Sequence, residues 1–171
     1  VSLVGSEMCI RDSLFADGDK VPEFIVWAQK DKYSASLQRV QIIKGSITSG
    51  GARPSEKVFD VVCSDGLAVD PTTHRCPDNG ARVNIEDCSI TDNVGATELK
   101  ATWRDPEFNP EDKAFYYVRV LENPTCRWST WDALKAGVKP RSDMHKTIQE
   151  RAWSSPIWYI PVPEDIDIFA L

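Results

Sequence analysis

The stretch Ala114–Leu121, with the sequence AFYYVRVL, decides the fold class of this chain. In an extended conformation its apolar side chains point to both faces, which is typical of a central strand covered on each side. Glu98–Arg104, ELKATWR, alternates instead: Leu99, Ala101 and Trp103 share one face, and charged or polar residues share the other. Together the two patterns predict a β-sheet with one buried face and a central, doubly covered strand.

Further strands are expected around these two. Alternation and short apolar runs predict them at Leu37–Lys44, Lys57–Cys63 and Arg82–Glu86, with Phe24–Ala28 as either a strand or a buried helix. Ile157–Ile160 lies between Pro156 and Pro161 and is expected at a sheet edge, because proline cannot donate a hydrogen bond to a neighbouring strand.

One short helix is expected after residue 128. Ser129 is placed to cap its N-terminus, with Asp132 three residues later, and Gly137 marks its end. Residues 64–81, rich in Asp, Pro, Gly and Thr, predict a long ordered loop. The sum is a mostly-β chain: an antiparallel, sandwich-like domain with one short helix.

The composition narrows the function classes. The 171 residues are 42% hydrophobic, enough to bury a core, and the longest apolar run has five residues, so no membrane-spanning helix is expected. Lys and Arg number 20 against 26 Asp and Glu, a net charge of −6. A nucleic-acid partner is not expected, because binding phosphates requires a basic face.

The two ends of the chain differ from its middle. Residues 1–13, VSLVGSEMCIRDS, lack the basic start and apolar centre of a signal peptide and resemble translated sequencing-adaptor sequence. We expect them to be a non-native extension, and the chain to be a fragment that lacks its N-terminal part. Residues 14–161 are expected to form the β-rich region and residues 162–171 a loosely attached tail.

With Cys9 set aside in that extension, the four cysteines Cys63, Cys76, Cys88 and Cys126 remain. An even number favours two disulfides in an oxidising compartment, periplasmic or extracellular; four buried thiols are the alternative. Three pairings are possible. Because short loops close at lower entropic cost, Cys63–Cys76 with Cys88–Cys126 is slightly favoured.

Candidate catalytic groups are sparse. Asp65, Asp70, His74 and Asp78 fall in one loop and could hold a hard cation, but their spacing matches no EF-hand, and capping of turns by Asp is the commoner role. No serine has the setting of a nucleophile, and no phosphate-binding loop is present. No catalytic or metal-binding residue is therefore assigned to this chain.

Arginines and tryptophans gather in the C-terminal third. Such clusters bind ligands through cation–π and stacking contacts, or form the buried centre of an interface, which we favour here. The residues of this candidate interface or ligand surface are Arg127, Trp128, Trp131, Arg151, Trp153 and Trp158.

Long segments of the chain resemble one protein family. FIVWAQKD, LQRVQIIKG, AFYYVRVLENPTCRWSTWDA and QERAWSSPIWYIP are among the stretches, in order, that resemble the C-terminal part of the DUF3604 family of bacterial proteins. That family is similar to the polymerase-and-histidinol-phosphatase-like (PHP) metal-dependent hydrolases. The resemblance implies a fragment of a larger, exported α/β metal-dependent hydrolase whose divalent-metal motifs lie upstream.

Two functions follow from these expectations. In the first, the chain is the non-catalytic C-terminal portion of a phosphoesterase, inactive alone and packed against a missing N-terminal barrel domain that holds the metal. In the second, it is a stand-alone binding or structural module whose Arg and Trp surface takes a carbohydrate or a protein.

Overall fold

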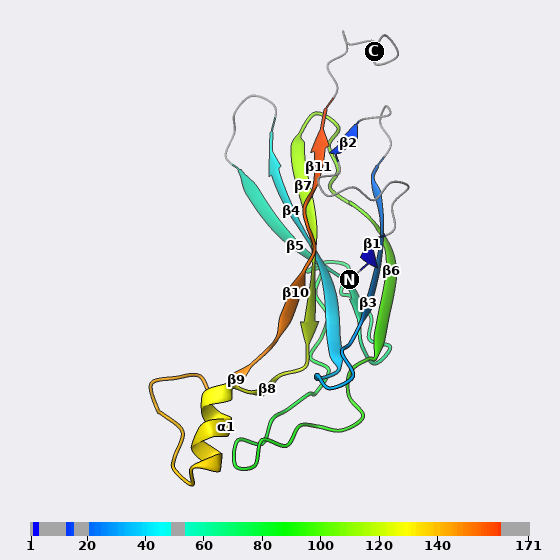
Figure 1. Ribbon diagram of the computed structural model, residues 1–171. Helices are drawn as coiled ribbons and strands as arrows, with labels where there is room; N and C mark the ends of the chain where they lie inside the picture. The colour runs from blue at the N-terminus through cyan, green and yellow to red at the C-terminus, as the bar shows by residue number, and fades with distance from the viewer. Residues whose placement is uncertain (1, 4–12, 16–20, 49–53, 162–171) are drawn as a thin grey trace.

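The computed structural model describes residues 2–3, 13–15, 21–48 and 54–161, which form a three-stranded sheet, a larger six-stranded sheet, a short two-stranded pair and one helix (Figure 1). The elements are β1 (Ser2–Leu3), β2 (Ser13–Phe15), β3 (Glu23–Gln29), β4 (Leu37–Ile47), β5 (Ser55–Cys63), β6 (Glu98–Arg104), β7 (Lys113–Glu122), β8 (Thr125–Cys126), α1 (Trp128–Lys135), β9 (Thr147–Ile148), β10 (Arg151–Trp153) and β11 (Ile157–Ile160).

The smaller sheet has the order β1-β3-β6. β3 and β6 pair in antiparallel register from Glu23 opposite Arg104 to Gln29 opposite Glu98. The bounds predicted for Glu98–Arg104 are confirmed, and Phe24–Ala28 is a strand, with every second residue buried. The small sheet therefore presents one apolar face, as its alternating sequence requires.

The larger sheet has the order β2-β11-β7-β4-β5, and β10 also pairs with β7. β7 is central, as predicted, because β4 lies on one side of it and β10 and β11 lie on the other. The prediction that β11 lies at an edge is wrong: residues Trp158–Ile160 pair in parallel with β2. Pro156 and Pro161 flank the strand, so the amides between them remain free to pair on both sides.

The core lies between the two sheets. Phe24, Val26 and Leu99 of the small sheet meet Val40, Ile42, Tyr116, Val118 and Tyr159 of the large one. The Phe24 and Tyr116 rings lie 4.8 Å apart between centroids, and Trp103 reaches across to Phe59 at 5.2 Å. Packing of the two sheets around one apolar layer gives a sandwich-like arrangement.

A buried polar cluster closes one end of this core. The Lys44 ammonium lies 2.5 Å from the Asp105 carboxylate, and the Tyr116 hydroxyl donates to the same carboxylate at 2.7 Å. Burial, followed by the hydrogen bond to Asp105, raises the pKa of Tyr116 well above its usual value. The cluster stabilises the turn that begins at Asp105, because the same side chain also accepts the Glu107 amide at 2.9 Å.

Two disulfides secure the long loops. The structure joins Cys63 to Cys76 and Cys88 to Cys126, the pairing that the shorter loops favour. The predicted strand at Arg82–Glu86 is wrong, since only an isolated bridge between Val83 and Ile90 forms there. Residues 82–86 lead into a turn and do not pair with a neighbouring strand beyond that single bridge.

Helix α1 begins two residues earlier than the predicted cap at Ser129 implies. Its N-cap is Arg127, whose side chain makes no capping hydrogen bond, so Ser129 lies inside the first turn and the prediction of its capping role is wrong. The C-terminal prediction is confirmed: Gly137 has a φ of +66°, and the Gly137 and Val138 amides close the helix on Leu134 and Ala133. Within the part of the chain that the structure describes, no helix has the length and hydropathy to cross a membrane.

The expected end segments are only partly within the described residues. Residues 2–3 of the predicted extension form β1 and residue 13 begins β2. Residues 1 and 4–12, and the predicted tail at 162–171, lie outside the described residues. The foreign origin of residues 1–13 stays a prediction.

Candidate interaction surfaces

The outer face of the large sheet, which points away from the core, carries a group of aromatic side chains. We call Phe115, Tyr117, Trp153 and Trp158 the aromatic sheet face. Phe115 and Tyr117 alternate along β7 with buried core residues and are themselves half-buried. Trp153 is 57% exposed and Trp158 46% exposed. The central strand is thus buried on its core side, whereas its other side, which the sequence also predicts to be covered, is only partly covered by the described residues.

Three of the four rings of this face form a chain of contacts. Trp158 lies directly across from Phe115, with ring centroids 5.3 Å apart, and Phe115 stacks on Tyr117 at 6.3 Å with an interplanar angle of 11°. Phe115 lies flat over the backbone of β4, where a Cβ on Gly45 would overlap its ring. Because Gly45 has no side chain, the Phe115 ring can lie close against the backbone of β4.

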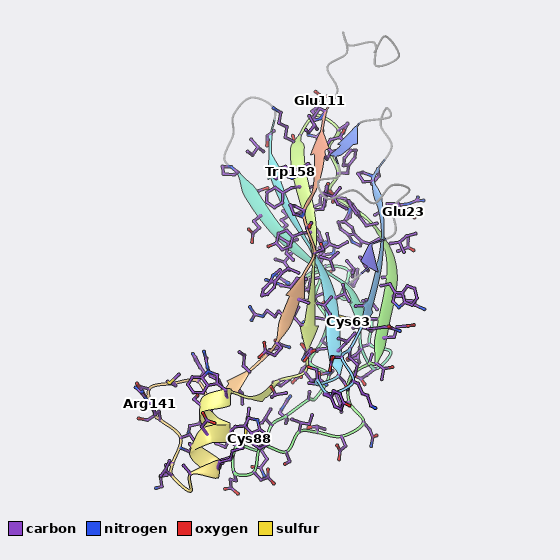
Figure 2. All side chains as sticks on the ribbon, in the orientation of Figure 1. Glu23, Cys63, Cys88, Glu111, Arg141 and Trp158 are labelled. Carbon is purple, nitrogen blue, oxygen red and sulfur yellow. A yellow bond between two sulfur atoms is a disulfide. The ribbon has the colours of Figure 1, made fainter. Side chains whose placement is uncertain are left out.

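A bulge brings both tryptophans to the same face. Trp158 lies five positions after Trp153, an odd spacing that would place them on opposite faces of a regular strand. Opposite β7, Trp153 pairs with Arg119 and Trp158 pairs with Phe115, so the β10–β11 segment has one extra residue at 154–156. Ser154 stabilises the bulge, because its hydroxyl accepts the Val118 amide at 2.9 Å. Figure 2 shows Trp158 on the upper part of the sheet.

Beyond the aromatic rings the face becomes polar. Arg119 donates to Gln41 at 2.7 Å, and Gln41 donates to Asp60 at 2.6 Å. The fully buried Asp60 carboxylate also accepts the Arg39 guanidinium at 2.9 Å and the Cys76 amide at 2.6 Å. Asp60 thus fastens the loop that carries Cys76 to the large sheet, and its groups are fully engaged in structure.

The structure divides the six predicted surface residues into two groups. Trp153, Trp158 and Arg151 lie on β10 and β11, with Arg151 two residues before Trp153 on the same strand. Trp128 and Trp131 lie on α1, and Arg127 is its N-cap. Figure 1 shows α1 and β11 toward opposite ends of the molecule, so the predicted cluster is two separate surfaces.

The acidic loop residues cap turns. Asp65 accepts the Gly95 amide, Asp70 accepts the Thr72 and Thr73 amides, and Asp78 accepts the Gly80 amide. Burial opposes ionisation of Asp65, but hydrogen bonds from Ser64, Gly95 and Asn79 outweigh it and lower its pKa. Among the described residues, no three His, Cys, Asp or Glu side chains are grouped as metal ligands.

Asp78 provides a measurable signature of this capping. Hydrogen bonds from the Arg82 guanidinium and the Gly80 amide lower the pKa of Asp78 from 3.8 to about 2. The carboxylate therefore favours the folded state above pH 3.8, and this contribution is lost as the pH falls through 2. We expect an NMR titration to place the Asp78 midpoint near 2, and Arg82→Ala to raise it; a normal midpoint in the unaltered chain would contradict the assignment.

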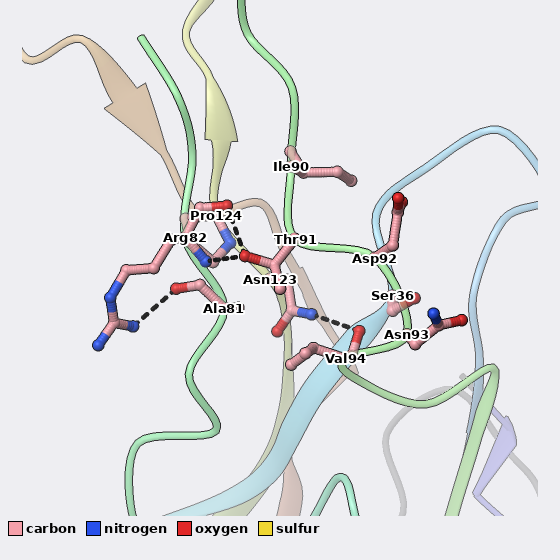
Figure 3. A pocket seen from close by; sticks show the side chains of 10 residues that line it. All are labelled: Ser36, Ala81, Arg82, Ile90, Thr91, Asp92, Asn93, Val94, Asn123 and Pro124. Atoms are coloured by element: carbon pink, nitrogen blue, oxygen red, sulfur yellow. Dashed lines mark hydrogen bonds between the residues drawn. The ribbon is translucent and has the colours of Figure 1, made fainter.

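A small pocket lies beside the long loops (Figure 3). It has a volume of about 100 Å³. Its deepest polar side chain, Asn123, donates to the Val94 carbonyl at 2.9 Å and accepts from Asn79 at 2.9 Å. Because both ends of that amide are engaged, the pocket presents no free recognition group from Asn123. The residues that line it are Ser36, Ala81, Arg82, Ile90, Thr91, Asp92, Asn93, Val94, Asn123 and Pro124.

Comparison with known proteins assigns the chain to a family. The model of a protein family of unknown function, DUF3604, matches residues 5–161. The chain belongs to the DUF3604 family. None of the curated proteins and none of the solved structures matches it. The aromatic sheet face and helix α1 of this DUF3604 chain both lie within the matched residues 5–161.

Sequence reasoning missed two members of the aromatic sheet face. The sequence pattern predicts Phe115 and Tyr117 only as part of a doubly covered strand, although their period-two spacing places them on one face. The buried role of Asp60 carries no local signal, since its partners Arg39, Gln41 and Cys76 come together only through strand register and a disulfide.

Proposed function

We propose that this chain is the non-catalytic, C-terminal β-rich part of an exported DUF3604 protein, and that its aromatic sheet face packs against a metal-dependent hydrolase domain of the same protein. The observation that carries the proposal is that face. On the central strand β7 the core-facing residues are buried, whereas Phe115 and Tyr117 on the opposite face are only half-buried within the described residues.

The size and composition of the face support a protein partner. The half-exposed Trp158 ring contacts the half-buried Phe115 ring, which stacks on Tyr117, and the exposed Trp153 lies on the same face opposite Arg119. Exposed aromatic side chains gathered on one face in this way mark an interaction site. Trp, Tyr and Phe are enriched at the centres of interfaces, and Arg119 and Arg151 at the edge of the patch fit a polar rim. A partner that covers the rings would give β7 the cover on its second side that its sequence predicts.

Export is supported by the two disulfides, because such bonds persist in oxidising compartments. The hydrolase activity is supported by the resemblance of DUF3604 sequences to PHP-type enzymes. Divalent metal bound in the other domain would supply an activated water for attack on a phosphate ester. In this proposal the chain supports and shapes the catalytic domain through its aromatic sheet face.

The test is a comparison of two proteins. A longer DUF3604 protein that contains this sequence, supplied with Mn²⁺ or Zn²⁺, is expected to hydrolyse a generic phosphoester, and the 171-residue chain alone is expected to give no turnover. Turnover by the short chain alone would contradict the non-catalytic role, and an inactive, metal-free longer protein would contradict the hydrolase assignment.

A second candidate function uses the same face to bind a carbohydrate. The exposed Trp153 and Trp158 rings favour it, because flat aromatic surfaces can stack on the apolar faces of sugars. Affinity electrophoresis of the isolated chain in polysaccharide gels tests it. Retardation that is lost in Trp158→Ala would support this module, and unchanged migration in all gels would exclude it.

A further inference from the structure

The second surface, on α1, has a different chemistry. We call residues 127–146, which comprise Arg127, α1 and the following loop, the helical arm. The arm contains five of the 20 Lys and Arg residues and two of the 26 Asp and Glu residues, so it has a net charge of +3 and the rest of the chain −9. Figure 1 shows the arm projecting beyond the end of the sheets. Positive charge is therefore concentrated on one protruding element of an acidic protein.

Apolar side chains accompany this charge. Trp128, Trp131 and Lys135 follow one another at i, i+3 and i+7, which places them along one side of the helix. Trp128 is 67% exposed and Trp131 is 43% exposed, and Val138 just after the helix is 59% exposed. The opposite side of α1 is the one that contacts the protein, because Thr130 is fully buried.

The arm is held firmly enough to present these residues. Thr130 donates its hydroxyl to the Lys146 carbonyl at 2.8 Å, and the Arg127 amide donates to the same carbonyl at 2.9 Å. The Cys88–Cys126 disulfide lies immediately before the arm and joins it to the segment that connects β5 and β6. Trp128 and Trp131 therefore lie on an anchored helix and point outward from it.

The cations of the arm are mostly available. Arg141 pairs with Asp143 at 2.6 Å. Lys135, Lys139 and Lys146 are exposed, and none of them forms an ion pair within the described part of the chain. The arm thus carries three lysines without an ion-pair partner among the described residues, together with two exposed indole rings. This combination suits a partner that is anionic and can accept apolar side chains.

We propose that the helical arm binds the surface of an anionic lipid bilayer. Indole rings favour the boundary between headgroups and acyl chains, and lysines near a membrane are attracted by anionic headgroups. The arm projects from the molecule, which suits contact with a broad surface, whereas the described pocket lies elsewhere, around Asn123. This inference concerns different residues from the proposed function and stands or falls separately.

Vesicle co-sedimentation of the 171-residue chain tests the proposal. Binding is expected to vesicles of equal parts phosphatidylglycerol and phosphatidylcholine, to weaken at high salt, and to be slight with phosphatidylcholine alone. The double variant Lys135→Glu/Lys139→Glu is expected to reduce partitioning about tenfold or more, since each cation near the surface contributes strongly. Trp128→Ala/Trp131→Ala is expected to lose binding and the blue shift of fluorescence on vesicle addition.

Matched variants outside the arm serve as controls. Trp27→Ala removes an exposed tryptophan from the small sheet, and Lys32→Glu/Lys113→Glu changes two exposed lysines elsewhere. Both are expected to retain most of the binding, with circular dichroism showing that every variant is folded. The proposal is wrong if the chain ignores anionic vesicles, if both arm variants bind normally, or if the chain binds heparin but not vesicles, which would indicate a soluble polyanion.

Discussion

Replacement of Asp60 by alanine is expected to lower the free energy of unfolding by about 3–5 kcal/mol, because removal of one partner from a buried ion pair leaves the other uncompensated. The Asp60 side chain is fully buried and accepts from Arg39, Gln41 and the Cys76 amide. The variant would leave the Arg39 guanidinium, only 18% exposed, without its carboxylate. It would also remove the hydrogen bond from the Cys76 amide, so that the loop would be held to the edge strand chiefly by the Cys63–Cys76 disulfide.

Urea unfolding followed by tryptophan fluorescence measures this loss. Glu111→Ala, at an exposed position that Figure 2 labels, is the matched control and is expected to change stability little. Asp60→Asn should fall between the two, because it keeps the shape of the side chain without its charge. A loss of less than about 1 kcal/mol in Asp60→Ala, the range of an exposed ion pair, would show that this network is not the anchor described here.

Loss of the Cys88–Cys126 disulfide is expected to cost about 4 kcal/mol, and loss of Cys63–Cys76 about 3 kcal/mol, because a cross-link over a longer loop restricts the unfolded chain more. The two bonds span 38 and 13 residues. Chemical denaturation of the paired Cys→Ala variants, without reductant, compares them directly. The reverse order would show that packing around Cys63 and Cys76, and not loop length, dominates.

Much of the fold could be predicted from local pattern. β6 is bounded where its alternation begins and ends, and the glycine after α1 stops the helix as expected. The prediction of Leu37–Lys44 ended three residues early, because Gly45 and Ser46 interrupt the apolar pattern while β4 continues to Ile47. Backbone pairing with β7 sustains that extension, and nothing in the local sequence reports it.

The candidate surfaces were predicted less well, for reasons of geometry. The six Arg and Trp residues are close in sequence, but α1 and the β8–β9 pair intervene between Trp128 and Trp158. Trp153 and Trp158 share a face only because Ser154 supports a bulge against Val118. An extra residue in a strand reverses the face to which every later side chain points, so alternation in the sequence does not predict that Trp153 and Trp158 share a face.

The central claim is that the aromatic sheet face is covered by another part of the same protein. Oxidative footprinting of tryptophan tests it most directly, in the 171-residue chain and in a longer DUF3604 protein that contains this sequence. We expect Trp153 and Trp158 to react readily in the short chain and to be protected in the longer protein, while the exposed Trp27 reacts equally in both. Equal reactivity of Trp153 and Trp158 in the two proteins would contradict the account.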